Sequence, residues 1–449
     1  MERERLKDLV AWKDSPHRKP LLLLGARQVG KTWLLREFGK ACFPHVAYVR
    51  FDTDPRARRI FEQGIDVPRI LENLQMATGV PIKAGETLVV LDEIQDCPAA
   101  LTALKYLCED AQELHVVAAG SLLGLEIHYG TGFPVGKVNM MNLYPLSFTE
   151  FMHATGNGQF AEALDKRDWQ MLNIFHGRYA DMLRLYFYIG GMPAAVQRYL
   201  DTGEFRQVRE VQRELLRAYR LDFSKHADAG VAALIEQIWD SIPEQIAREN
   251  KKFVYSDAAP GLRARNATAP MLWLLRSGLI HHNNRVKKPE IPLSAYQDGA
   301  FKAFLNDVGL LAAMCGLDTR VLLEHNRVFG EYKGALTEQY VQQQLLAEGH
   351  DDKTYYWARE RNEIDFLLST DRGIVPLEAK AGVNLNSKSL HAFCKRFGFK
   401  LAVRASMHTY QRNTVTPAGG EPYELVELPL YALSQLHAEC GFPKPSYAW

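Results

Sequence analysis

The sequence predicts an α/β protein of several domains whose first domain contains a parallel sheet. A run of four leucines, Leu21 to Leu24, precedes a glycine-framed turn and a helical pattern, which indicates a buried strand followed by a turn and a helix. A second apolar run, Thr87 to Leu91, shows no polar alternation, which is typical of a strand covered on both faces. The 449 residues exceed what one hydrophobic core supports, so we expect roughly two to four domains.

Composition narrows the class of protein. The chain is 47% hydrophobic and 24% charged, as in ordinary globular proteins. Its net charge of +1 excludes a global attraction to nucleic acid or membranes, so any basic site must be local. Its 6 cysteines form no C-x-x-C pair, which argues against a zinc site or disulfide scaffold and favours a reducing compartment. Met1 to Val10 lacks a signal-peptide core and no apolar run reaches ~18 residues, so we expect a soluble, cytoplasmic protein without membrane contact.

The turn after the leucines reads Gly25-Ala26-Arg27-Gln28-Val29-Gly30-Lys31-Thr32, which fits the phosphate-binding P-loop G-x-x-x-x-G-K-[ST]. Glycine lets the backbone curl around a triphosphate, and a helix beginning near Gly30 aims free N–H groups at it. We expect Lys31 to reach the β- and γ-phosphates and the Thr32 hydroxyl to ligate Mg²⁺. The predicted nucleotide-binding residues are Gly25, Arg27, Gln28, Val29, Gly30, Lys31, Thr32 and Trp33.

Two carboxylates follow the apolar strand at Thr87 to Leu91. A strand at His45 to Asp52 precedes it in the chain. Asp92 and Glu93 would emerge at the carboxyl end of the sheet, where open α/β sheets bind their ligands. Asp92 fits the residue that holds the hydrated Mg²⁺, and Glu93 fits the base that polarises the attacking water. An acidic pair at any solvated strand end is the alternative.

A helix beginning at Pro98 and a strand at His115 to Ser121 come next. In a parallel sheet, Ser121 would emerge beside the γ-phosphate and act as a sensor of the nucleotide. The guanine-reading tetrapeptide N-K-x-D is missing, since Asn250-Lys251-Lys252 is followed by Phe253. Adenine is therefore the expected base, and ATP with Mg²⁺ the expected ligands.

Four segments together resemble a prokaryotic family of AAA-superfamily ATP-binding proteins: Gly25 to Thr32, Leu91 to Gln95, Ala119 to Ser121 and Tyr144 to Phe151. Members carry a C-terminal domain of uncharacterised function that resembles restriction endonucleases. Further matches are Gly190 to Pro193, Asp307 to Leu311, Glu363 to Phe366 and Leu377 to Lys380. Many relatives carry a Gly-Arg pair where this chain reads Gly136-Lys137, and lysine cannot make bidentate phosphate contacts, so no arginine finger is assigned.

The middle of the chain reads as helical. Long amphipathic helices at Trp169 to Tyr188 and Phe205 to Tyr219, divided by Gly190 to Pro193, predict a helical subdomain over the nucleotide. From Ile246 to Arg285 the pattern of helix, basic turn, helix and strand resembles a winged helix. The basic residues around it are Arg248, Lys251, Lys252, Arg263, Arg265, Arg285, Lys287 and Lys288. Such a module either contacts DNA phosphates or packs inside the protein, and both alternatives stay open.

The last part of the chain carries a candidate metal site. Glu378 and Lys380 share one face of a predicted strand, Asp365 lies on the neighbouring strand, and Glu338 lies on the preceding helix. Converging carboxylates require a cation, and hard oxygen ligands favour Mg²⁺ or Mn²⁺. With a lysine to orient water, this is the arrangement that metal-assisted phosphodiester cleavage needs. The alternative is a plain salt bridge between Lys380 and Glu378 among surface acids.

These observations predict four modules: a P-loop ATPase core at 1–155, a helical subdomain at 156–245, a winged-helix-like module at 246–325 and an α/β restriction-endonuclease-like domain at 326–449. We expect a Mg²⁺-dependent ATPase coupled to a domain that binds or cleaves DNA; the alternative is a non-catalytic, ATP-driven switch acting on a protein partner. An oligomer is compatible with either. The expected catalytic residues are Lys31, Glu93, Ser121, Asp365, Glu378 and Lys380. The expected metal ligands are Thr32, Asp92, Glu338, Asp365 and Glu378.

Overall fold

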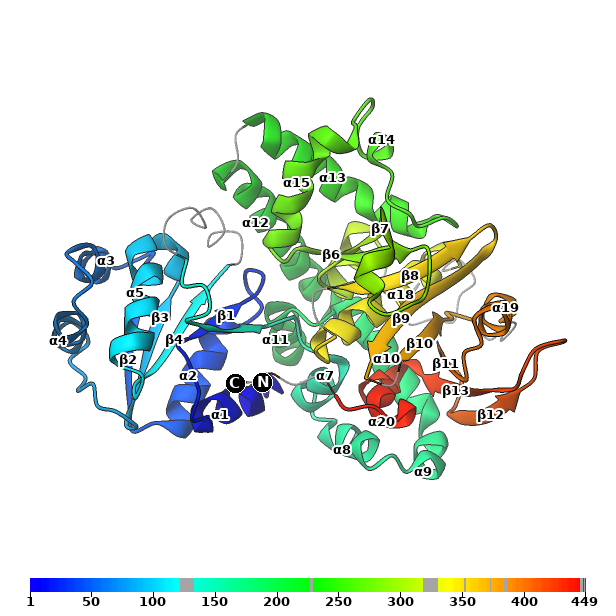
Figure 1. Ribbon diagram of the computed structural model, residues 1–449, viewed down its shortest axis with the longest axis horizontal. Helices are drawn as coiled ribbons and strands as arrows, with labels where there is room; N and C mark the ends of the chain where they lie inside the picture. The colour runs from blue at the N-terminus through cyan, green and yellow to red at the C-terminus, as the bar shows by residue number, and fades with distance from the viewer. Residues whose placement is uncertain are drawn as a thin grey trace. The chain divides into compact units, whose positions relative to one another are not determined.

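The chain forms two compact units (Figure 1). The computed structural model describes residues 1–121, 133–226, 229–317, 330–350, 353–371, 373–382, 387–444, 447 and 449. One unit, here called the P-loop unit, consists of Glu2–Tyr144, the segment Arg276–Leu279 and the last few residues. The other, here called the mixed-sheet unit, consists of Pro145–Leu275 and Ile280–Pro445.

The P-loop unit is built on a five-stranded sheet in the order β2-β3-β4-β1-β5, and all the pairs are parallel. The strands are β1 (Leu21–Leu24), β2 (His45–Arg50), β3 (Thr87–Asp92), β4 (His115–Gly120) and β5 (Asn139–Asn142). Leu24 pairs with Gly120, and Asp92 pairs with Ala119, so β1, β3 and β4 end nearly level. The segments that follow these three strands therefore leave the same edge of the sheet, as the sequence predicts.

Helices cover both faces of this sheet, which explains why β1, β3 and β4 are buried throughout. Leu22, Val89 and Leu91 contribute to a core with α3, α4 and α5. On the other face, Gly39 of α2 packs closely against Val46 and Leu88. The helices are α1 (Arg5–Asp14), α2 (Lys31–Cys42), α3 (Pro55–Glu62), α4 (Val67–Thr78) and α5 (Pro98–Asp110), with the short 3₁₀ helix η1 (Ile94–Asp96).

The mixed-sheet unit contains an eight-stranded sheet in the order β12-β13-β11-β10-β9-β8-β6-β7. The strands are β6 (Ile280–Val286), β7 (Gln297–Leu305), β8 (Thr354–Arg359), β9 (Asn362–Thr370), β10 (Gly373–Ala379), β11 (Leu401–Ser406), β12 (Gln411–Val415) and β13 (Tyr423–Pro429). The strand expected to close a separate winged helix, β6, instead pairs in parallel with β8. The module boundary expected near residue 325 therefore falls between strands of one sheet.

Helices surround this sheet (Figure 1). They are α7 (Phe148–Ala154), α8 (Gly158–Lys166), α9 (Trp169–Ile174), α10 (His176–Ile189), α11 (Pro193–Thr202), α12 (Phe205–His226), α13 (Ala229–Ala247), α14 (Tyr255–Ala258), α15 (Ala264–Arg276), α16 (Val308–Met314), α18 (Gly330–Ala347), α19 (Lys388–Phe397) and α20 (Leu436–Cys440), with 3₁₀ helices η2 (Leu293–Tyr296) and η4 (Leu430–Gln435). The helix expected from Trp169 to Tyr188 is divided at Phe175 into α9 and α10. Among the described residues, no helix is both long and apolar enough to cross a membrane.

Three segments that are far apart in the sequence meet at one buried junction of the mixed-sheet unit. A side chain on Gly191 would overlap the backbone of Leu146, and one on Gly190 would overlap the Asp307 carboxylate. The Tyr186 hydroxyl donates to the Leu146 carbonyl at 2.5 Å, and the Gly191 N–H donates to Asp307 Oδ2 at 2.6 Å. These three segments include residues that resemble the family described above. In this structure, their role is to join the segments around Leu146, Gly191 and Asp307 to one another.

Candidate functional site

The P-loop has the backbone that its sequence requires. Gly25, Gln28 and Gly30 adopt positive φ angles of 155°, 66° and 99°. A side chain on Gly25 would overlap the Leu143 carbonyl oxygen, so only glycine fits at that position. The loop then passes directly into α2 at Lys31, so the free N–H groups of the first helical turn point toward the loop. This geometry suits a phosphate chain.

Lys31 is held close to the backbone of the loop. Its ammonium group donates to the carbonyl oxygens of Gly25 at 2.8 Å and Ala26 at 3.0 Å. Burial lowers the pKa of Lys31 to about 8, while the carboxylates of Glu93 and Asp92 oppose that shift. A phosphate group beside this ammonium would favour its charged form, so nucleotide binding and protonation of Lys31 should be mutually reinforcing.

Asp92 is 1% exposed and is held from two elements. Its Oδ2 accepts from the Thr32 hydroxyl of α2 at 2.8 Å and from the Tyr48 hydroxyl of β2 at 2.5 Å. Thr32 and Asp92 are thus adjacent, as residues that share a hydrated Mg²⁺ must be, and the donor set of one hydroxyl and one carboxylate fits that ion. Burial, and then the bond to Asp92, raise the pKa of Tyr48, so its hydroxyl stays a donor. The sequence gives no local signal for this role of Tyr48.

Glu93 lies at the end of β3 in a left-handed conformation with φ 54°. Its Oε2 accepts from Gln95 Nε2 at 2.6 Å. The other end of that amide, Gln95 Oε1, accepts from the backbone N–H of Ser121 at 3.3 Å. Glu93 and Ser121 are therefore linked through one side chain at the sheet edge. Sequence reasoning did not single out Gln95 as a functional residue.

The other predicted loop residues have different exposures. Arg27 and Gln28 are exposed, and Trp33 is 41% exposed. Val29 is fully buried, and its carbonyl accepts from Arg3 Nη1 at 2.8 Å. The side chain of Val29 therefore anchors the loop in the core, and its contribution to a nucleotide site would come from its backbone.

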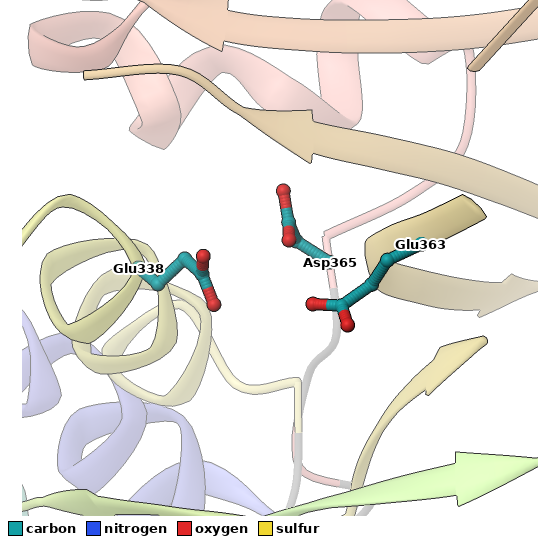
Figure 2. A group of neighbouring side chains, drawn as sticks. All are labelled: Glu338, Glu363 and Asp365. Carbon is teal, nitrogen blue, oxygen red and sulfur yellow. The ribbon is translucent and has the colours of Figure 1, made fainter. Parts of the chain in front are cut away.

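A second group of charged residues lies in the mixed-sheet unit. Figure 2 shows the carboxyl groups of Glu338, from α18, and of Glu363 and Asp365, from β9, directed toward one another. One ligand atom from each lies within 4.8 Å of the others. Glu338 and Asp365 were predicted to meet. Glu363 was not, although its spacing of two residues from Asp365 on a strand is a usable signal.

Lys302 supplies the positive charge within this group. It lies on β7, is 0% exposed, and donates to Glu338 Oε2 at 2.9 Å and to Glu363 Oε1. Its ammonium is 3.6 Å from Asp365 Oδ1 and 5.0 Å from the centre of the Tyr356 ring. The three carboxylates outweigh the effect of burial and raise the pKa of Lys302 well above its usual value. This lysine is charged throughout the ordinary pH range.

The carboxyl groups around Lys302 differ in their ionisation. Lys251 also pairs with Glu338, and the two lysines outweigh burial and lower the pKa of Glu338. Burial, and then repulsion from Glu338, raise the pKa of Asp365. Two ammonium groups thus already balance much of the acidic charge. As it stands, the cluster does not need a divalent cation and does not fit one well.

Glu378 does not join this cluster. Its Oε1 pairs with Lys380 at 2.9 Å, which is the salt bridge that the sequence left open as an alternative. Its Oε2 is buried and has no hydrogen-bond partner among the described residues. Asp365 is nevertheless close to this strand, because its Oδ2 accepts from the Ala379 N–H at 2.9 Å. A metal ion at Glu378 would therefore bind this one unpartnered carboxylate oxygen.

The pairing of β9 with β8 is irregular at Asp365. Tyr355 pairs with Leu367 and Trp357 pairs with Ile364, so β9 has one more residue than β8 between these pairs. Such a bulge turns the side chains within it away from the regular alternation. Asp365 lies inside this bulge and reaches Lys302. All three acids were expected to converge. The structure brings Glu338 and Asp365 together, while Glu378, on the regularly paired β10, forms its salt bridge with Lys380.

Comparisons with known proteins agree with the first site. Residues 17–152 match the family of AAA domains. Residues 180–321 and 333–431 match two families described as domains of unknown function, DUF8612 and DUF4143. The eight-stranded sheet takes β6 and β7 from the first of these regions and its other six strands from the second. No curated protein matches the chain.

Three solved structures are distantly similar. The Walker-type ATPase of Pyrococcus abyssi shows 15% identity and a TM-score of 0.45, over 70% of this chain and 96% of that chain. The Aeropyrum pernix Orc1 protein in complex with DNA shows 12% identity and a TM-score of 0.28, over 70% and 93%. Cdc6p from Pyrobaculum aerophilum shows 11% identity and a TM-score of 0.25, over 70% and 92%. At these scores the similarities support no argument about function.

Proposed function

We propose that this chain, whose residues 17–152 form an AAA-type P-loop ATPase domain, is a Mg²⁺-dependent ATP hydrolase. Nucleotide state would control an endonuclease-like C-terminal domain that binds or cleaves DNA. The observation that supports ATP hydrolysis most strongly is the cluster of site residues at one edge of the parallel sheet. Thr32 contacts Asp92 there, and Glu93 is linked to Ser121.

Each site residue of the P-loop unit has a distinct role in this proposal. The loop N–H groups and the Lys31 ammonium would hold the phosphates of ATP. Thr32 and Asp92 would hold the hydrated Mg²⁺, which neutralises charge on the phosphate oxygens. Glu93 would orient the attacking water and accept its proton. Ser121 would contact the γ-phosphate and so distinguish ATP from ADP.

The proposal for the second unit rests on the arrangement of β9, β10 and α18. Asp365 and Glu378 lie on paired strands, Glu338 approaches from α18, and Lys380 is beside Glu378. This order of elements supports an endonuclease-like domain from about residue 326. The orphaned oxygen of Glu378 is the feature that favours metal chemistry there. DNA would approach along the exposed basic residues Lys252, Arg263, Arg265, Lys287 and Lys288.

A second candidate function is the non-catalytic switch, in which ATP state controls binding to a protein partner. Two observations favour it. Lys302 already fills the acidic cluster. Arg248 pairs with Asp257 and Glu244, and Arg285 pairs with Asp298 at 2.9 Å, so part of the basic surface is neutralised internally. A lysine in the place of a metal would let the domain keep its fold without cleaving DNA.

One experiment separates these functions. The purified protein is incubated with supercoiled and linear DNA, with Mg²⁺ or Mn²⁺, with and without ATP, while phosphate release is followed in parallel. Metal-dependent cleavage that is lost in Asp365→Ala, with ATP hydrolysis retained, supports the nuclease. ATP hydrolysis without cleavage under any metal supports the switch. If ATP is hydrolysed neither with Mg²⁺ nor with Mn²⁺, the proposed ATP hydrolase activity is refuted.

A further inference from the structure

Gln95 bridges two groups that the proposed mechanism uses separately. Its Nε2 donates to Glu93 Oε2 at 2.6 Å, and its Oε1 accepts from the Ser121 N–H at 3.3 Å. The 3₁₀ helix η1 turns the chain after Glu93 and brings Gln95 over the end of β4. Both polar ends of one amide are thus used, and both bonds end at the edge where the γ-phosphate would lie.

Gly120 leaves the space that Gln95 occupies. A side-chain carbon on Gly120 would lie 2.7 Å from Gln95 Oε1 and 3.2 Å from Ile94 Cγ2. Gly120 is the last residue of a regular strand and has no positive φ angle, so its backbone does not require glycine. The requirement is steric, and it concerns Gln95 directly.

We propose that Gln95 is a positioning residue for ATP hydrolysis. It holds one oxygen of the Glu93 carboxylate, leaves the other free for water, and ties the base to the backbone of Ser121. This inference rests on the proposed role of Glu93 as the base. Because Gln95 binds no substrate atom in this arrangement, its loss should lower kcat while the affinity for ATP stays the same.

The test combines two substitutions that disturb the bridge from opposite sides. Gln95→Met keeps the length of the side chain and removes both hydrogen bonds. Gly120→Ala keeps Gln95 and displaces its carbonyl end. We expect each to lower kcat roughly 10- to 100-fold, the loss that follows a misplaced catalytic group, with the dissociation constant for ATP changed less than about twofold. Because both substitutions act on one bridge, the kcat of the double variant should be no lower than that of the less active single variant.

Two matched controls separate this effect from damage to the fold. Gln63→Ala removes an exposed glutamine of the same unit, and Gly177→Ala adds a methyl group where no atom lies within 4 Å. Both should keep the parent kcat, and the thermal midpoints of all variants are compared. A parent-like kcat in Gln95→Met, or losses that multiply in the double variant, would overturn the inference. Parent-like hydrolysis by Glu93→Gln would instead refute the proposed base, so the two failures are distinguishable.

Discussion

The Tyr48 hydroxyl donates to Asp92 at 2.5 Å, on the same oxygen that accepts from Thr32. Tyr48 lies on β2, and Arg36 of α2 lies over its ring at 5.1 Å. Two elements, α2 and β2, thus fix the orientation of one buried carboxylate. That orientation decides whether Asp92 and Thr32 face a common ion, so Tyr48 acts on the metal through Asp92.

Tyr48→Phe should therefore weaken the affinity for the Mg²⁺ that hydrolysis requires, without removing ATP binding. A hydrogen bond to a charged group contributes about 1.5–3 kcal/mol, so the Mg²⁺ concentration for half-maximal rate should rise about tenfold or more. Titration of Mg²⁺ at saturating ATP measures this. Asp92→Asn should have a larger effect in the same assay. An unchanged Mg²⁺ requirement in Tyr48→Phe would show that the contact does not orient Asp92.

Lys31→Ala should abolish ATP binding. The Lys31 ammonium is held at the loop by the Gly25 and Ala26 carbonyl groups, where it would meet the phosphates. Titration with a fluorescent ATP analogue measures the change, and Lys40→Ala, at an exposed position in the last turn of the same helix, serves as a control for the fold of α2. If Lys31→Ala binds ATP as tightly as the parent, the P-loop is not the ATP-binding site.

Lys302→Met should destabilise the mixed-sheet unit strongly. The substitution leaves Glu338, Glu363 and Asp365 without their shared ammonium group, and breaking a buried ion pair costs about 3–5 kcal/mol. Urea unfolding measures it, with exposed Lys287→Met as the control. Mn²⁺ should restore part of the stability of the variant, because the acids would then accept a divalent ion. A loss of less than ~1 kcal/mol would contradict a structural role for Lys302.

The stability of the mixed-sheet unit should also depend on pH through Asp307. Burial raises the pKa of Asp307 from its ordinary 3.8 to about 6. The folded state then binds this proton more tightly than the unfolded state. Its contribution to stability is therefore largest below pH 3.8 and declines as the pH rises through about 6.

Comparison with Asp307→Asn isolates this contribution. Between pH 3 and pH 8, the unfolding free energy of the parent should fall relative to the variant by up to ~3 kcal/mol, since each pKa unit is worth about 1.4 kcal/mol. Chemical denaturation at a series of pH values measures the difference. A parent–variant difference that is constant with pH would contradict the raised pKa.

Sequence reasoning succeeded where the signal was local. The strand, turn and helix from Leu21 to Cys42 are encoded by neighbouring residues, and so is the apolar strand that ends at Asp92. The order of parallel strands then places Asp92, Glu93 and Ser121 at one edge. No tertiary information beyond a parallel sheet was needed for this part of the site.

It failed where the partner came from a distant element. Nothing near Lys302 in the sequence indicates that β7 brings it to Glu338, because that contact depends on how the strands and α18 assemble. The bulge at Asp365 is set by pairing with β8, and β6 joins that same strand, so neither could be inferred from local periodicity. Tyr48 was missed for the same reason, because its partner Asp92 lies on another strand. Gln95 contacts Glu93 two residues away, but its second partner, Ser121, follows a different strand.

The central claim is that Glu93 is the base of an ATP hydrolase, and Glu93→Gln tests it most directly. The variant keeps the shape of the side chain and loses the carboxylate. In a single-turnover experiment with excess enzyme, Mg²⁺ and labelled ATP, we predict that it binds ATP as tightly as the parent. Hydrolysis of the bound nucleotide should be slowed about 100-fold or more. Hydrolysis at the parent rate would contradict the account.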